Sequence, residues 1–279
     1  MVVHDAVKLL AALGVCFFHC GVPGRNAWYG GMFYFLFFLG YVPPRSETAA
    51  EYIRRRARRL LAPWLAWSLV YAALQLMTGG LRLPGRGAST LLIGPSLHLW
   101  FLPFAFLGGL GLRRLGRLVG RASFFRPLSV GALFGMVFAI TARLHGSLIS
   151  PFGQWLVSAP MLVLGALVVH TPSQRERGFL FAAAAIGTVP FLESGSGLAT
   201  MIAIPTCWFV LGPERPELKT LKRLGDLSFG VYLIHPAAIA ALQKLDPLPS
   251  AYIQGLLAFI LSVAAAALMR SVKLTRWLV

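Results

Sequence analysis

HDAVKLLAALGVCFFH, residues 4–19, is the stretch that decides the fold. It is an apolar run that predicts a helix, yet it carries Asp5, Lys8 and His19. At about 100° per residue, Lys8 and His19 leave such a helix on the same face. Their backbones are then roughly 16 Å apart along the helix axis. Because an ionisable side chain in a membrane helix needs a partner or water, it indicates a functional site. We therefore expect His19 to lie at the functional centre.

The composition places the chain in a membrane. Hydrophobic residues make up 57% of the sequence and charged residues only 13%, whereas a soluble domain has about 25% charged residues. The opening run lacks a basic leader and a small-residue cleavage site, so we expect it to remain as a helix. We predict an all-α, polytopic integral membrane helix bundle, with residues 1–279 forming one transmembrane domain. About ten transmembrane helices are expected, near residues 7–22, 28–43, 60–78, 97–112, 128–142, 156–170, 179–192, 196–212, 228–242 and 252–269.

The distribution of positive charge predicts the orientation of these helices. The net charge is +17, which in a soluble chain would suggest nucleic-acid binding. With the N-terminus in the cytoplasm, 21 of the 26 lysines and arginines fall on the cytoplasmic side. Such an imbalance follows the positive-inside rule and requires an even number of helices. We therefore expect both termini in the cytoplasm, membrane lipids as partners, and no nucleic acid.

A basic cytoplasmic loop follows the second apolar segment. Ser46 or Thr48 can cap a short helix here, because their hydroxyls accept backbone N–H bonds. Two interpretations of its charge remain open: attraction to anionic lipid, or a cradle for a phosphate-bearing cytoplasmic cofactor, since guanidinium groups match phosphate geometry. The arginines concerned are Arg54, Arg55, Arg56, Arg58 and Arg59.

Three residues are candidates for the outer mouth of the bundle. His98 enters the fourth segment from the outer side and Trp100 follows it, although a tryptophan there also suits an ordinary interfacial anchor. Glu193 lies at a helix end between the seventh and eighth segments. It is either a solvated helix end or a partner of His19 or His98.

Two further features of the sequence have mainly structural interpretations. Asp226 followed by Ser228 can cap the ninth helix. His235 lies deeper, directly before a proline, where the kinked backbone can hold it, and we expect a structural role. The three cysteines, at positions 16, 20 and 207, fall inside apolar segments without a disulfide or zinc spacing. We therefore expect no metal site.

Taken in order, four patterns resemble the membrane acyltransferase type 3 family of O-acyltransferases. Asp5 and His19 fit the Asp, Arg and His signature of the family's first helix, with Lys8 in place of the arginine. The other matches are the Arg-rich stretch 54–63, His-Leu-Trp-Phe-Leu at 98–102, and the segment 228–235 ending in Tyr-Leu-Ile-His. Lys8 keeps the charge but loses the bidentate fork, and Leu39-Gly40 replaces the family's usual Ser-Gly.

This resemblance implies an O-acyltransferase of the bacterial cytoplasmic membrane. The donor would be cytoplasmic acyl-CoA, with acetyl-CoA expected from the family's precedent, and the acceptor a hydroxyl of a glycan or related molecule. As our own hypothesis from the residues, His19 would act as general base or form an acyl-histidine, with Glu193 as a second catalytic group. His98 and Trp100 would contact the acceptor. The donor would be held by Lys8, Asp5, Arg54, Arg55, Arg58 and Arg59.

Two other functions remain open from the sequence. Kinked helices with intramembrane ionisable groups also suit a multi-pass transporter or flippase. The sequence shows no inverted repeat and no pair of acidic residues in mid-membrane, which argues against that alternative. The Lys8 change also leaves room for a catalytically silent relative that serves as an assembly partner.

Overall fold

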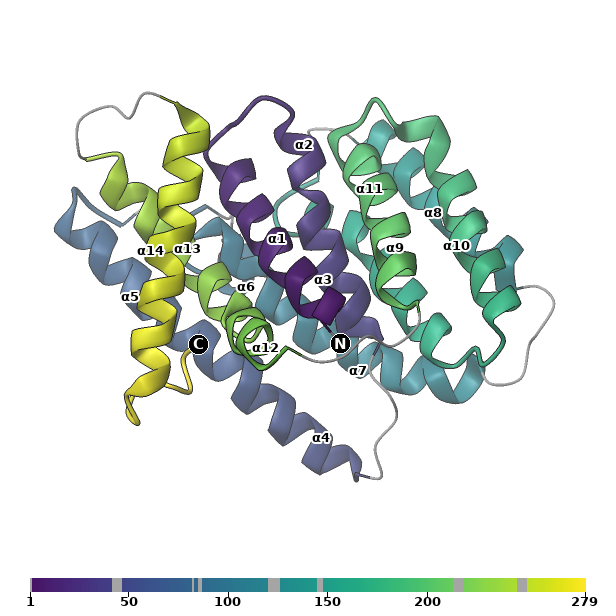
Figure 1. Ribbon diagram of the computed structural model, residues 1–279, viewed down its shortest axis with the longest axis horizontal. Coiled ribbons are helices and arrows are strands. Elements are labelled where there is room, and N and C mark those ends of the chain that lie inside the picture. The colour runs from purple at the N-terminus through teal and green to yellow at the C-terminus, as the bar shows by residue number, and fades with distance from the viewer. Residues whose placement is uncertain are drawn as a thin grey trace. The chain divides into compact units, whose positions relative to one another are not determined.

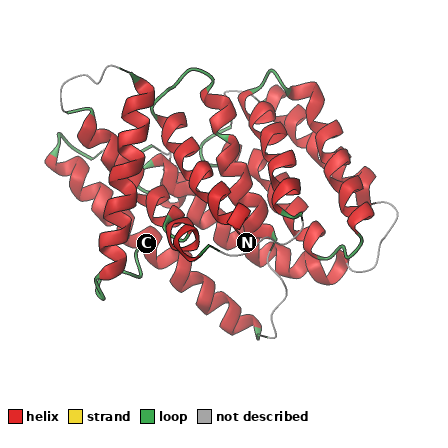
Figure 2. Ribbon diagram, viewed as in Figure 1, coloured by secondary structure: helices red, strands yellow, loops and turns green. Residues whose placement is uncertain are grey.

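The computed structural model of the protein describes residues 2–41, 47–81, 83–84, 87–119, 126–144, 148–212, 218–244 and 250–279. Within these residues the chain forms helices and connecting turns and contains no strand (Figure 2). Helix accounts for 81% of the structure. The prediction of an all-α fold is therefore confirmed for the described residues.

The helices follow one another closely along the chain (Figure 1). Each of the ten predicted apolar segments overlaps at least one of them. The bounds are α1 (Val2–His19), α2 (Arg25–Trp28), α3 (Gly30–Gly40), α4 (Ala49–Arg56), η1 (Ala57–Leu61), α5 (Ala62–Met77), η2 (Gly87–Ser89), α6 (Thr90–Ile93), η3 (Leu97–Trp100), α7 (Phe101–Val119), α8 (Arg126–Arg143), α9 (Phe152–Val169), α10 (Gln174–Thr188), η4 (Val189–Phe191), α11 (Gly195–Val210), α12 (Lys219–Gly225), α13 (Ser228–Leu242) and α14 (Ala251–Ser271).

Three helices among the described residues are long and apolar enough to cross a membrane. They are the continuous helix Ala49–Met77, α9 and α14. Helices α12 and α13 meet the same criteria only as a pair, which is bent by 48°. Large apolar side chains such as Leu69 and Met77 are exposed on the surface, as expected of helices that face lipid. The number of ten spans and the cytoplasmic termini stay predictions.

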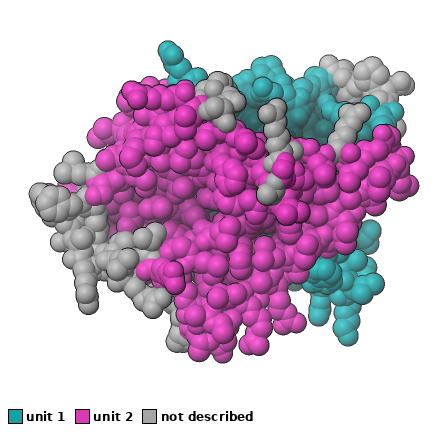
Figure 3. Space-filling view, turned by 180° about the vertical axis from the view of Figure 1, so that it is seen from behind, with its two compact units in different colours: residues 1–35, 193–279 teal, residues 36–192 magenta. Residues whose placement is uncertain are grey.

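The chain divides into two compact units (Figure 3). Unit 1 comprises Met1–Phe35 and Glu193–Val279, and unit 2 comprises Leu36–Leu192. The description of residues 1–279 as one transmembrane domain stays a prediction. Arg45, Arg121 and Arg215 of the predicted cytoplasmic loops, Arg82 and Arg86 of the opposite side, and the alternative cap Ser46 lie outside the described residues.

Unit 1 is built around α1. This helix packs against α12, α13 and α14, and α13 also packs along α14 (Figure 1). Small side chains allow these contacts, because Ala12 and Cys16 are buried against Val231 of α13. At the start of α1, His4 Nδ1 lies 2.7 Å from the hydroxyl of Tyr34, which is buried on α3.

In unit 2, glycines allow two helices to pack closely. Helix α10 packs against α8, and α9 packs against α7 and α8. The C-terminal end of α3 crosses α9 through two glycines in a reciprocal arrangement. A Cβ at Gly40 would meet the carbonyl oxygen of Leu162, and a Cβ at Gly165 would meet that of Phe37. Only residues without a side chain let two helix backbones approach so closely.

The Gly165→Ala variant tests this crossing. The added methyl group must displace the Phe37 carbonyl, and such overpacking typically costs about 1–3 kcal/mol. We expect a lower melting temperature for the detergent-purified variant. Gly111→Ala in α7 is the matched control, because a Cβ there meets no described atom within 4 Å. Equal melting temperatures for wild type and both variants would contradict the reciprocal glycine crossing.

Candidate active site

The sequence-predicted base, His19, lies beside a second histidine. His19 is the last residue of α1 and is exposed, whereas His235 of α13 is fully buried. Their ring centroids are 5.0 Å apart and the rings are tilted by 41°. Both residues belong to unit 1. The structure thus brings together an exposed imidazole and a buried one at the end of the first helix.

A hydrogen bond within α13 fixes the orientation of the buried ring. His235 Nδ1 lies 2.7 Å from the carbonyl oxygen of Tyr232. In a regular helix, that carbonyl would accept a bond from the N–H of residue 236. Residue 236 is Pro236, which lies inside the helix and has no N–H to donate. The proline therefore leaves a carbonyl that the imidazole of His235 satisfies, in accord with the structural role predicted for this residue.

The charged residues of α1 form an ion-pair network with two other helices of unit 1. Lys8 Nζ lies 2.7 Å from Asp5 Oδ1 and 3.7 Å from Asp226 Oδ1. Asp226 Oδ2 in turn lies 3.8 Å from a guanidinium nitrogen of Arg270 on α14. Asp5 is buried. Gly225 of α12 permits this packing, because a Cβ there would lie 3.0 Å from Asp5 Cβ.

The network corrects one prediction made from the sequence. Asp226 and Ser228 were expected to cap the ninth helix, but the N-cap of α13 is Leu227, without a side-chain bond. Asp226 instead ends α12 and faces Lys8. The reason is electrostatic: a half-buried lysine near the start of α1 needs negative partners. The predicted role of Lys8 and Asp5 in holding the donor stays a prediction.

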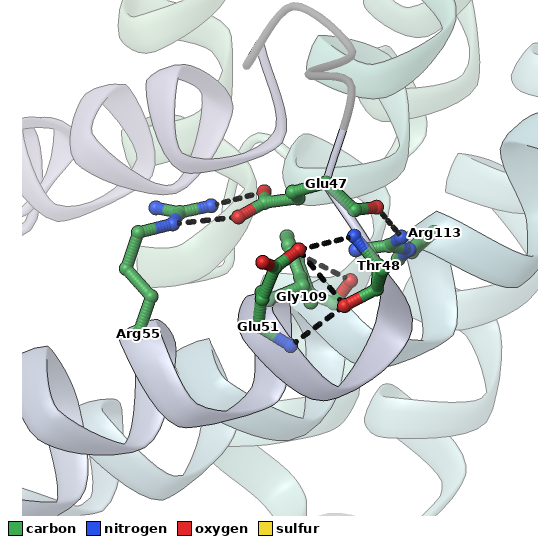
Figure 4. Close-up of polar contacts among 7 residues, drawn as sticks. Glu47, Thr48, Glu51, Arg55, Gly109 and Arg113 are labelled. Carbon is green, nitrogen blue, oxygen red and sulfur yellow. Dashed lines mark hydrogen bonds and ion pairs between the residues drawn. The ribbon is translucent and has the colours of Figure 1, made fainter.

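The basic helix of unit 2 begins with the predicted cap at Thr48. The Thr48 hydroxyl accepts the backbone N–H of Glu51 at 3.2 Å, and the Glu51 carboxylate accepts the backbone N–H of Thr48 at 2.8 Å (Figure 4). This reciprocal pair is a capping box. It confirms the Thr48 cap and sets the start of the helix that presents the arginines.

The arginines of this helix fall into three environments. Arg55 donates two hydrogen bonds to the carboxylate of Glu47, at 2.7 and 3.1 Å (Figure 4). Arg56 is buried and donates to the carbonyl oxygen of Ala105 at 2.6 Å. The remaining side chains are exposed: Arg54, Arg58 and Arg59. Of the predicted donor-binding arginines, Arg55 therefore has its guanidinium committed to a carboxylate.

Tyr52 packs among the same positive groups. The centre of its ring lies 5.4 Å from the Cζ atoms of both Arg55 and Arg56 and 4.7 Å from that of Arg113. The Tyr52 hydroxyl donates to the Gly109 carbonyl at 2.9 Å, and Arg113 donates to the Glu47 carbonyl at 2.6 Å. These contacts attach the basic helix to α7. The cluster is therefore anchored by aromatic and backbone groups as well as by charge.

A π-helical turn, η1, carries two of the exposed arginines, Arg58 and Arg59. The backbone N–H of Ala62 bonds to the carbonyl of Ala57, five residues earlier. Pro63 follows at the start of α5 and cannot donate a helical bond. The wider turn accommodates this break without ending the helix.

The predicted acceptor residues lie in different environments. His98 and Trp100 are buried in η3 of unit 2, where His98 Nδ1 lies 2.8 Å from Ser96 Oγ. The His98 ring packs edge-on against Tyr71, with the centroids 5.1 Å apart. Glu193 is exposed in unit 1, and its neighbour Ser194 caps α11. Any approach of His98 or Trp100 to His19 joins different units and stays a prediction.

The comparisons with known proteins identify the family. A family model described as an acyltransferase domain matches residues 4–270, nearly the whole chain. The chain belongs to the acyltransferase type 3 family. No curated protein and no solved structure matches it. The resemblance noted in the sequence is thus confirmed, and an acyltransferase activity within a multi-pass membrane protein is supported.

Four residues near the candidate sites of this acyltransferase were not predicted as partners. Asp226 and Arg270 extend the Lys8 network, Glu47 holds Arg55, and His235 faces His19. The His-Pro sequence at 235–236 carries a usable signal, because a proline within a helix always removes one donor. The ion pairs of Asp226 carry no comparable signal, since Lys8 and Arg270 lie far from it in the sequence.

The three arginine environments predict unequal effects on stability. Arg56→Gln removes a buried charge-assisted hydrogen bond to Ala105, a class of bond worth about 1.5–3 kcal/mol. We expect its melting temperature in detergent to fall, while that of Arg58→Gln stays near wild type because this side chain is exposed. If the two variants melted at the same temperature, the structural assignment of Arg56 would be wrong.

Proposed function

We propose that this acyltransferase transfers an acyl group, in the first instance acetyl, from cytoplasmic acyl-CoA to a hydroxyl of a glycan or related acceptor. Its setting would be the bacterial cytoplasmic membrane. The observation that carries the proposal is the position of His19: it ends α1 as an exposed imidazole, in a chain that matches an acyltransferase domain over residues 4–270. A neutral imidazole is a suitable general base near physiological pH.

The proposed step balances with His19 as the only base. A ring nitrogen of His19 takes the proton of the acceptor hydroxyl as its oxygen attacks the thioester carbonyl carbon. The new C–O bond forms, the C–S bond breaks, and the proton passes to the departing CoA thiolate. Positioned proton transfer of this kind typically contributes 10²–10⁴-fold to the rate. The alternative course, attack by His19 itself to form an acyl-histidine, uses the same residue.

For the donor, the exposed arginines of the basic helix are the proposed contacts. Arg54, Arg58 and Arg59 are exposed, and guanidinium groups bind phosphate oxygens in a planar, bidentate manner. The anionic nucleotide end of acyl-CoA offers several phosphate groups. Arg55 is a weaker candidate than the sequence suggested, because a phosphate would have to compete with Glu47 for its guanidinium.

For the acceptor, we keep His98 and Trp100 as the proposed contacts and Glu193 as the proposed second catalytic group. The burial of His98 against the ring of Tyr71 supports a rigid wall, and aromatic faces suit sugar rings with apolar faces. Glu193 is exposed, so it is open to a hydroxyl-bearing ligand. Lys8 and Asp5 already form an ion pair, which supports a role for them in holding the polar end of α1 together.

The His19→Ala variant tests the proposal. We expect release of the CoA thiol from acetyl-CoA, measured in membranes of cells that make the protein, to fall by about 10²-fold or more. Acetylated surface glycans should be lost in parallel when measured by mass spectrometry. His170→Ala is the matched control, because His170 is exposed at the end of α9 in unit 2, and we expect it to retain wild-type rates.

Two outcomes would remove the proposal. Undiminished glycan acylation with His19→Ala would exclude this residue as the base. Purified wild-type protein that neither binds nor cleaves acetyl-CoA would instead favour a transporter or a silent assembly partner.

A further inference from the structure

The buried imidazole of His235 has a defined protonation pattern. Its Nδ1 lies 2.7 Å from the Tyr232 carbonyl oxygen, and a carbonyl can only accept a hydrogen bond. Nδ1 must therefore carry the proton that forms this bond. In a neutral imidazole the proton then sits on Nδ1, and Nε2 presents a lone pair.

Pro236 makes this arrangement stable. An N–H at position 236 would compete for the Tyr232 carbonyl, and the proline removes that competitor. The ring is also fully buried within α13, so it has little freedom to turn. Burial and the internal hydrogen bond thus hold one tautomer and one ring orientation.

The ring that carries this lone pair lies beside the ring of the proposed catalytic base. The ring centroids are 5.0 Å apart, so a rotation of the exposed His19 ring can bring one of its N–H groups within hydrogen-bond reach of the His235 ring. Nε2 of His235 can accept such a bond from a ring N–H of His19. A bond of this kind leaves the lone pair of His19 on its other nitrogen, where an acceptor hydroxyl can approach.

We propose that His235 is a positioning residue that selects the tautomer and orientation of His19. The inference rests on the proposed function of His19 as base. In a catalytic triad, a buried carboxylate accepts a hydrogen bond from the histidine and fixes its tautomer and orientation. His235 would have the same function for His19. An imidazole in place of the carboxylate brings no permanent charge into the helix bundle, where an unpaired carboxylate would be costly.

Two amide variants separate positioning from packing. In His235→Asn, the amide nitrogen can occupy the place of Nδ1 and keep the bond to Tyr232, but nothing replaces Nε2. In His235→Gln, the amide oxygen can occupy the place of Nε2 and accept from His19, but the bond to Tyr232 is lost. If His235 is purely structural, the bond from Nδ1 to Tyr232 is what matters, and His235→Asn should be the milder change. If His235 positions His19, the acceptor at Nε2 is what matters, and His235→Gln should be the milder change.

We expect kcat for acetyl-CoA turnover to be at least about tenfold higher for His235→Gln than for His235→Asn, within the range that proton transfer supplies. The KM for acetyl-CoA should be the same in both variants, because neither change touches the proposed donor contacts. Melting temperatures of both proteins in detergent serve as the control for folding. Equal kcat values, or a higher kcat for His235→Asn, would overturn the proposal.

Pro236→Ala keeps the assignment testable if either amide variant fails to fold. The restored N–H competes with His235 for the Tyr232 carbonyl and loosens the ring, so we expect kcat to fall by about tenfold. Pro205→Ala, which removes an intrahelical proline from α11 of the same unit, should keep the wild-type kcat. A wild-type kcat for Pro236→Ala would overturn the proposal.

Failure of this inference is distinguishable from failure of the proposed function. If His19→Ala is inactive while the kcat of His235→Asn equals or exceeds that of His235→Gln, His19 remains the proposed base and the positioning role of His235 is wrong. If His19→Ala is fully active, both proposals fall together.

Discussion

Ionisable groups on an apolar helix must find partners within the fold, and this constraint organises unit 1. Lys8 has Asp5 on its own helix and Asp226 beyond it, and Arg270 completes the set. Because charges are costly in a membrane interior, the elements that carry these partners must pack against α1. The contacts of α12 and α14 with α1 agree with this requirement. The same helix then presents His19 at its other end.

Prolines and glycines determine which backbone groups are free and how closely helices approach in both units. Pro236 leaves a carbonyl that orients a histidine, and Pro63 follows a π turn that carries two exposed arginines. Gly225 and Gly165 let backbones approach where any side chain would intrude. In each case a residue without an ordinary backbone donor or side chain determines what its neighbours can reach. The features that shape the candidate site are therefore backbone features as much as side-chain ones.

The sequence predicted most of the fold and part of the site, for identifiable reasons. Hydrophobic runs predicted helix at ten segments, each of which overlaps a helix of the described residues, and the Thr48 cap was predicted because its chemistry is local. Asp226 was misassigned as a cap because its partner, Lys8, lies more than two hundred residues away in the chain. His235 was expected to be structural, and its contact with His19 depends on how α1 and α13 pack. Local rules cannot supply such pairings.

The account centres on an acyl donor whose reactive end reaches His19. Modification of this histidine by diethyl pyrocarbonate, followed by mass spectrometry of the folded wild-type protein with and without acetyl-CoA, tests it most directly. His19 and His170 are both exposed, and only His19 belongs to the proposed site. We predict that acetyl-CoA slows modification of His19 and leaves that of His170 unchanged. An unchanged His19 rate at acetyl-CoA concentrations that saturate turnover would contradict the account.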